Sequence, residues 1–103
     1  MDKPLIVVNF KTYETAMGDS ALTLAKAMDN FTDRDFRMIA VVSAFDLSTI
    51  SNSVSSVEVW SQHLDPVGKG SHTGWLEPDL AIHHGAVGTI INHAEHKVTI
   101  EHV

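Results

Sequence analysis

Four short apolar runs, rich in β-branched residues, are the feature of this 103-residue sequence that most limits how it can fold. Three of them are nearly continuous rather than alternating, which is typical of strands buried on both faces of a parallel sheet. The third alternates in part, because Glu58 and Ser61 interrupt it. The runs cover residues Leu5–Phe10, Arg37–Val42, Val57–Ser61 and Ala86–Ile91.

The segments between the runs carry helix signals. Asp19 or Ser20 can cap a first helix that ends at Asn30, and Pro78 suits the first turn of a third helix. The expected helices cover residues 19–30, 45–50 and 78–84, with Gly85 as the stop and a fourth helix starting at Lys97–Val103. This alternation predicts an α/β fold of about four β/α units with right-handed crossovers and a parallel sheet. A long irregular loop is expected from Gln62 to Trp75.

Composition excludes several classes of function. Seven Lys and Arg stand against thirteen Asp and Glu, for a net charge of −6, and the basic residues are scattered, so nucleic acid is not expected as a partner. The absence of cysteine excludes disulfide scaffolds, thiolate catalysis and cysteine-ligated zinc. The longest apolar run is far shorter than the ~20 residues that a membrane helix needs, and the first four residues do not form a signal peptide. We therefore expect a cytoplasmic domain and no membrane partner.

Polar side chains follow the apolar runs at the points where the strands are expected to end. They are Asn9 and Lys11, then Ser43, then Gln62, His63 and Asp65, then Asn92, His93 and Glu95. The carboxyl ends of parallel strands meet at one edge of a sheet, where active sites of such folds lie. The sequence thus predicts a functional site at this edge. The alternative is that these residues only cap helices and solvate loops.

Other binding motifs can be tested and rejected. The glycines between Gly68 and Gly74 have neither the P-loop ending nor the dinucleotide-binding spacing. His93 and His96 form a conceivable metal pair, but they lack a convincing third ligand, so we expect no metal. His83 and His84 stand at a predicted helix end, where a cation favours the helix dipole, and a surface capping role is expected.

Three segments together resemble a known family. Val8–Tyr13 (VNFKTY) is similar to the first strand of triosephosphate isomerases of the compact archaeal type. Gln62–Pro66 and Gly70–Gly74 resemble the third strand and long dimer loop of that family, and Gly85–Glu95 resembles its fourth strand and catalytic histidine segment. The resemblance implies a (β/α)₈ barrel, of which residues 1–103 would form the N-terminal half as an incomplete single domain.

The resemblance also implies a reaction and roles. The family interconverts dihydroxyacetone phosphate and glyceraldehyde 3-phosphate through an enediolate, in glycolysis and gluconeogenesis, without a cofactor and as a homo-oligomer. Lys11 would be the catalytic cation, Asn9 would bind a substrate oxygen, and His93 would be the catalytic imidazole, kept neutral to polarise the carbonyl. Supporting roles would belong to Glu95, which would contact Lys11, and to Gln62, while Thr73 would reach across a subunit interface.

The resemblance covers only part of a barrel, which takes ~250 residues. The glutamate base after the sixth strand and the late phosphate-binding loops have no counterpart among these residues, so we expect the isolated chain not to isomerise trioses. Two hypotheses remain open from the sequence. The chain is either the N-terminal portion of an isomerase that needs a C-terminal half, or a non-catalytic half-barrel module that self-associates or docks on a partner. Ala94 and Trp75 depart from the family, which commonly has serine and often an acid there.

Overall fold

The fold is built on a three-stranded parallel sheet in the order β1-β2-β3. The computed structural model describes residues 4–31 and 36–99. The strands are β1 (Leu5–Asn9), β2 (Arg37–Val42) and β3 (Glu58–Ser61), and each lies within one of the predicted apolar runs. This confirms the predicted α/β class and the parallel sheet.

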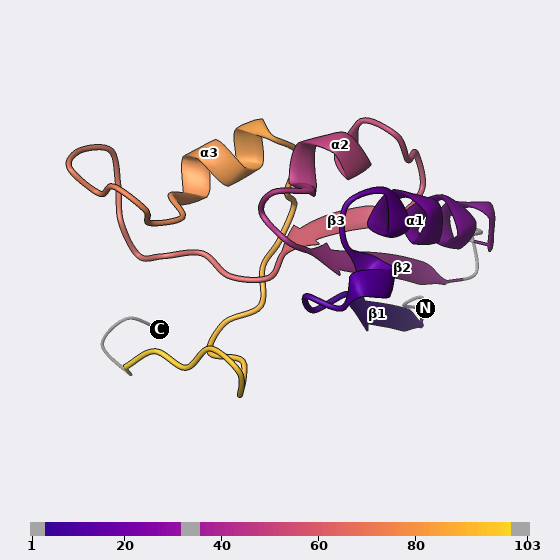
Figure 1. Cartoon of the computed structure of the whole chain (residues 1–103), viewed down its shortest axis with the longest axis horizontal. Coiled ribbons are helices and arrows are strands. Elements are labelled where there is room, and N and C mark those ends of the chain that lie inside the picture. Colours follow the sequence, from indigo (N-terminus) through magenta and orange to yellow (C-terminus); the bar gives the residue numbers. More distant parts are fainter. Residues whose placement is uncertain (1–3, 32–35, 100–103) are drawn as a thin grey trace.

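The chain forms three α-helices and one short 3₁₀ helix within the described residues. They are α1 (Asp19–Phe31), α2 (Leu47–Ser51) and α3 (Pro78–His83), with the 3₁₀ helix, η1 (Glu14–Ala16), after β1. Helices α1 and α2 cover one face of this sheet, and α3 lies to the side, beyond the end of β3 (Figure 1). The core lies between α1, α2 and the sheet and includes Ala25, Met28, Ala40, Val42, Ile50 and Val59. None of the helices in the described ranges is long and apolar enough to cross a membrane.

The other face of the sheet carries the alternate side chains of each strand, and no helix of the described residues packs on it (Figure 1). On the central strand, Ile39 and Val41 are fully buried beside their register partners on both neighbouring strands. On the edge strand β1, Leu5 and Val7 are about half exposed, at 50% and 48%. The sheet is therefore open, with an apolar edge at β1.

Local chemistry sets the ends of α3 and the loop before β3. The Glu77 carboxylate accepts from the Leu80 backbone N–H at 2.8 Å, Pro78 stands in the first turn, and Gly85 follows the helix with φ +103°, as the capping pattern predicted. At the end of α1, one oxygen of Asp29 accepts from the backbone N–H of Ser56 at 2.7 Å. The same carboxylate accepts from the N–H groups of Ser55 and Val57, so it fixes the chain that enters β3.

Two predicted elements do not form as expected. The run Ala86–Ile91 is not a strand: it makes a single parallel bridge, between Thr89 and Ser61. Only its β3 side has a partner in the described residues, Val87 and Ile91 remain exposed, and Gly88 adds no side chain to pack. The helix expected from Lys97 is absent at residues 97–99, and residues 100–103 lie outside the described part of the chain.

Candidate active site

A cavity of about 340 Å³ opens at the carboxyl ends of β1 and β3. The segment that follows the Thr89 bridge closes its other side. The residues that line the cavity come from these three places: Asn9, Lys11, Thr12, Tyr13, Gln62, Ile90, His93, Glu95 and His96. Polar groups that are 84 residues apart in sequence, on Lys11 and Glu95, thus meet at one edge of the sheet.

The end of β1 is held in a tight turn by hydrogen bonds. The Asn9 side-chain oxygen accepts from the Lys11 backbone N–H at 2.9 Å. The Lys11 backbone is left-handed, with φ +54°, and its carbonyl accepts from the Gln62 side-chain Nε2 at 2.6 Å. Gln62 follows β3 directly, so the two strands fix the position of Lys11 jointly.

Lys11 carries the positive charge of the cavity. Its Nζ lies 3.3 Å from Glu95 Oε2 and 5.6 Å from the centre of the Tyr13 ring. The hydrogen bond that Lys11 donates to Glu95, together with the charge of that carboxylate, raises the pKa of Lys11 above its ordinary value, and Tyr13 acts in the same direction. The Lys11 side chain therefore remains an ammonium group throughout the neutral range.

The hydrogen bonding of His93 defines which ring nitrogen bears a proton. His93 Nδ1 accepts from the Glu95 backbone N–H at 3.0 Å, so Nδ1 carries no hydrogen and the neutral ring has its proton on Nε2. The His93 side chain is 32% exposed and lines the cavity. An Nε2–H group is a donor suited to an oxygen atom inside the cavity.

The cavity gathers donors of three kinds: the side-chain amide of Asn9, the ammonium of Lys11 and the imidazole of His93. Donors held in place before reaction stabilise negative charge that develops on an oxygen atom, most strongly where water is excluded. The arrangement can thus stabilise an oxyanion. Within residues 4–31 and 36–99 no group of three or more His, Cys, Asp or Glu side chains is placed to hold a metal ion.

The structure brings together five of the residues singled out from sequence: Asn9, Lys11, Gln62, His93 and Glu95. Five others lie elsewhere: His63, Asp65 and Asn92 line a separate hollow, and the remaining two are Thr73 and Ser43. Thr73 is exposed on the long loop and does not line this cavity, and Ser43 accepts from the Phe45 N–H within the β2–α2 loop.

Sequence reasoning did not assign Thr12, Tyr13 and Ile90 to the cavity, and it considered His96 only as a metal ligand. Tyr13 stands two residues beyond Lys11 in the same turn. Its position close to Lys11 in the sequence was the signal that could have identified Tyr13 as a cavity residue.

A parallel sheet with helices on one face, an open opposite face and a polar cavity at its carboxyl edge defines part of an α/β barrel, as the predicted partial (β/α)₈ fold requires. The sequence profile of the triosephosphate isomerase family matches residues 4–103. The chain belongs to the triosephosphate isomerase family, a family of enzymes.

Archaeal triosephosphate isomerases are among the relatives. The chain is 38% identical over 97 residues to that of Archaeoglobus fulgidus, covering 93% of this chain and 43% of that protein. Identity is 37% over 101 residues to that of Methanothermus fervidus, covering 97% and 45%, and 32% over 104 residues to that of Saccharolobus solfataricus, covering 100% and 45%. The chain thus spans less than half the length of the curated relatives it matches.

Proposed function

We propose that this chain is the N-terminal half of a triosephosphate isomerase, and that it supplies the groups that stabilise the enediolate oxygen. The observation that carries the proposal is the convergence of Asn9, Lys11 and His93 on one cavity in a chain of this family. The substrate class would be a triose phosphate, and the enzyme would act in the cytoplasm.

The chemistry assigns each group a step. Removal of a proton from the carbon next to the substrate carbonyl creates negative charge on the carbonyl oxygen. His93 Nε2–H donates to that oxygen, and the Lys11 ammonium stabilises the charge as it develops. Asn9 and Gln62 act on the position of Lys11, through its N–H and its carbonyl respectively.

Glu95 is the carboxylate that lines the cavity within residues 4–31 and 36–99, and we infer that the proton-abstracting base comes from outside this chain. The Glu95 carboxylate is bonded to Lys11 and the Glu95 backbone N–H to His93. In the family resemblance the base and the phosphate-binding loops belong to later strands of the barrel, a length that the chain does not span. The partner we infer is therefore a C-terminal half that pairs with the open edge of β1, where Leu5 and Val7 are exposed.

The same proposal includes assembly of the enzyme as a homo-oligomer. Thr73 stands exposed on the loop between β3 and α3, clear of the cavity of its own chain. We infer that it reaches the site of a second subunit once the barrel is complete. The competing function, a half-barrel module without catalysis, is favoured by the same exposed β1 edge, because an unpaired apolar strand can pair with another copy.

Reconstitution tests the proposal. The purified chain is mixed with the remaining C-terminal part of the Archaeoglobus fulgidus isomerase, and triose phosphate turnover is measured beside size-exclusion chromatography. We expect no turnover from the chain alone and measurable turnover from the mixture. Lys11→Met should lower that turnover by roughly 10²- to 10³-fold, the scale of losing one oxyanion donor. Lys26→Met, which removes an exposed lysine of α1, should leave it unchanged.

Three results would contradict the proposal. Turnover by the chain alone would show that the base lies within it. A stable complex of the two parts that never turns over would favour the non-catalytic module. A Lys11→Met variant as active as wild type would contradict the role proposed for Lys11.

A further inference from the structure

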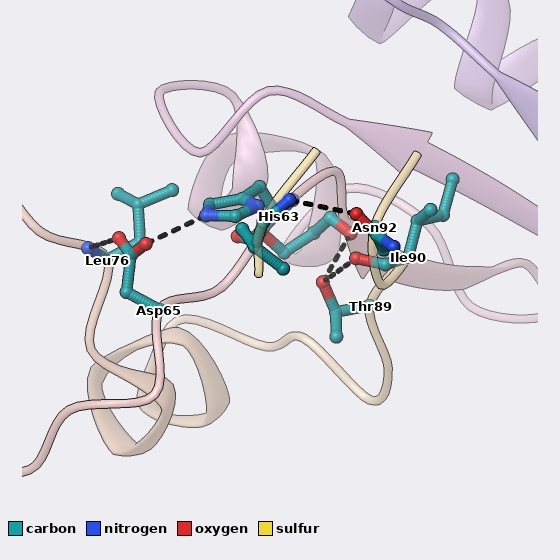
Figure 2. A network of polar contacts seen from close by, with 8 residues as sticks. His63, Asp65, Leu76, Thr89, Ile90 and Asn92 are labelled. Atoms are coloured by element: carbon teal, nitrogen blue, oxygen red, sulfur yellow. Dashed lines mark hydrogen bonds and ion pairs between the residues drawn. The ribbon is translucent and has the colours of Figure 1, made fainter. Parts of the chain in front are cut away.

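A polar pair, the buried His63 and the partly buried Asp65, lies beside the cavity, outside the group of donors described above. His63 is 9% exposed and follows β3 by two residues. Its backbone carbonyl accepts from the hydroxyl of the buried Ser61 at 2.7 Å, and its ring Nε2 lies 2.8 Å from Asp65 Oδ1. Figure 2 shows the His63 ring directed at the Asp65 carboxylate. Both the backbone and the ring of His63 are therefore fixed.

Asp65 is itself held by hydrogen bonds with the backbone of Leu76, just before α3. Its second oxygen accepts from the Leu76 backbone N–H at 2.7 Å, and its own N–H donates to the Leu76 carbonyl at 2.8 Å (Figure 2). Partial burial works to raise the pKa of Asp65, but the Leu76 N–H and the neighbouring His63 outweigh it and hold that pKa below its ordinary value. Asp65 is thus a carboxylate at neutral pH and holds the His63 ring in one orientation.

The ring of His96 packs against the ring of His63. The two imidazoles stack with centroids 3.8 Å apart and an interplanar angle of 12°. His96 closes the turn that begins at His93, because its backbone N–H donates to the His93 carbonyl at 2.9 Å. The turn is otherwise open to solvent, with Ala94, Glu95 and His96 all exposed. The stack therefore connects an exposed turn to the buried end of β3.

We propose that His63 is a positioning residue: held by Asp65, its ring fixes His96, and through His96 it holds the turn that presents His93 to the cavity. This inference rests on the role given to His93 in the proposed function. Displacement of a reacting group by about 1 Å costs up to 100-fold in rate, so a turn that carries His93 needs an anchor. Lys11 holds the same turn from the opposite side through Glu95, at the surface.

The test measures the order of the turn rather than turnover. Backbone ¹⁵N relaxation of the full chain gives an order parameter for residues 94–96, and the ¹⁵N shift of His93 Nδ1 reports its bond to Glu95. In the wild type we expect an order parameter of about 0.85, falling below about 0.6 in both His63→Ala and His96→Ala. His63→Phe keeps a ring to stack on but cannot bond to Asp65, so the turn should stay as loose as in His63→Ala. His83→Ala, which alters the surface pair His83–His84 on α3, should change nothing.

A rigid turn in His96→Ala would overturn the proposal, and so would a His63→Phe variant as rigid as the wild type, because Asp65 would then play no part. Should His63→Ala fail to fold, His96→Ala decides, because His96 is exposed and outside the core. Isomerase activity does not enter the measurement. The positioning role of His63 can therefore be disproved while the proposed isomerase function stands, and the isomerase function can be disproved while the positioning role stands.

Discussion

Replacement of Gly85 by alanine should destabilise the chain more than any other single methyl addition at its glycines. Gly85 follows the end of α3 and has a φ angle of +103°. A Cβ atom placed there would overlap Ser51 Oγ and lie 2.5 Å from Ser51 Cβ, at the end of α2. The left-handed backbone costs an L-residue roughly 1–2 kcal/mol, and forcing an extra methyl into filled space costs about 1–3 kcal/mol. The free energy of unfolding should therefore fall by about 2–5 kcal/mol.

Urea unfolding followed by circular dichroism measures this loss, and two variants separate its causes. Gly68→Ala adds a methyl where nothing lies within 4 Å, so it should stay within about 0.5 kcal/mol of wild type. Combining Gly85→Ala with Ser51→Gly removes the overlap and should recover the steric part, leaving the backbone cost. A Gly85→Ala chain as stable as Gly68→Ala would refute the reasoning, since neither the φ angle nor the Ser51 contact would then matter.

Three further changes test other parts of the structure. Partial burial works to raise the pKa of Asp29, but hydrogen bonds from backbone N–H groups outweigh burial and lower that pKa. The stabilisation that Asp29 gives is therefore fully present above the unfolded pKa of about 3.9, and it is lost as pH falls through the lower, folded pKa. Asp29→Ala should cost about 1 kcal/mol at pH 7 and flatten the acid limb of the stability curve. Gly88→Ala should shift the fluorescence of Trp60 and cost about 1–3 kcal/mol, because its Cβ would meet the indole ring, 2.5 Å from Cδ2. The Arg37 hydrogen bond lowers the pKa of Glu58, so Glu58→Gln should lower the melting temperature at neutral pH, and the difference should shrink in 1 M salt.

The backbone elements were predictable where burial and local chemistry agree. The apolar runs identified β1, β2 and β3 because those strands are buried by neighbours on at least one side. Pro78 and Gly85 bounded α3 because proline fixes φ at a helical value in the first turn and glycine allows the positive φ that follows the helix. The run Ala86–Ile91 has the same apolar character but no second partner among the described residues, so composition alone overestimated it.

The convergence of three polar residues on one edge was predictable from the sequence, whereas the contacts around them were not. Strand ends in a parallel sheet meet at one edge, and that rule placed Asn9, Lys11 and His93 correctly near one another. Nothing in the sequence shows that His63 stacks on His96, because the contact joins residues from two separate loops. The bond between Gln62 and the Lys11 carbonyl likewise depends on how far each chain continues beyond its strand.

The backbone conformation of Lys11 predicts which substitutions this position would accept during evolution. Glycine adopts a φ of +54° freely and asparagine tolerates it, as Asn92 does at +58°, whereas lysine does so at a conformational disadvantage. Pressure for folding alone would favour replacing Lys11, since its side chain adds nothing to the packed interior. A sequence that retains lysine there would be keeping the ammonium for a purpose other than stability. When selection for function is relaxed, glycine should therefore be among the first residues to replace Lys11.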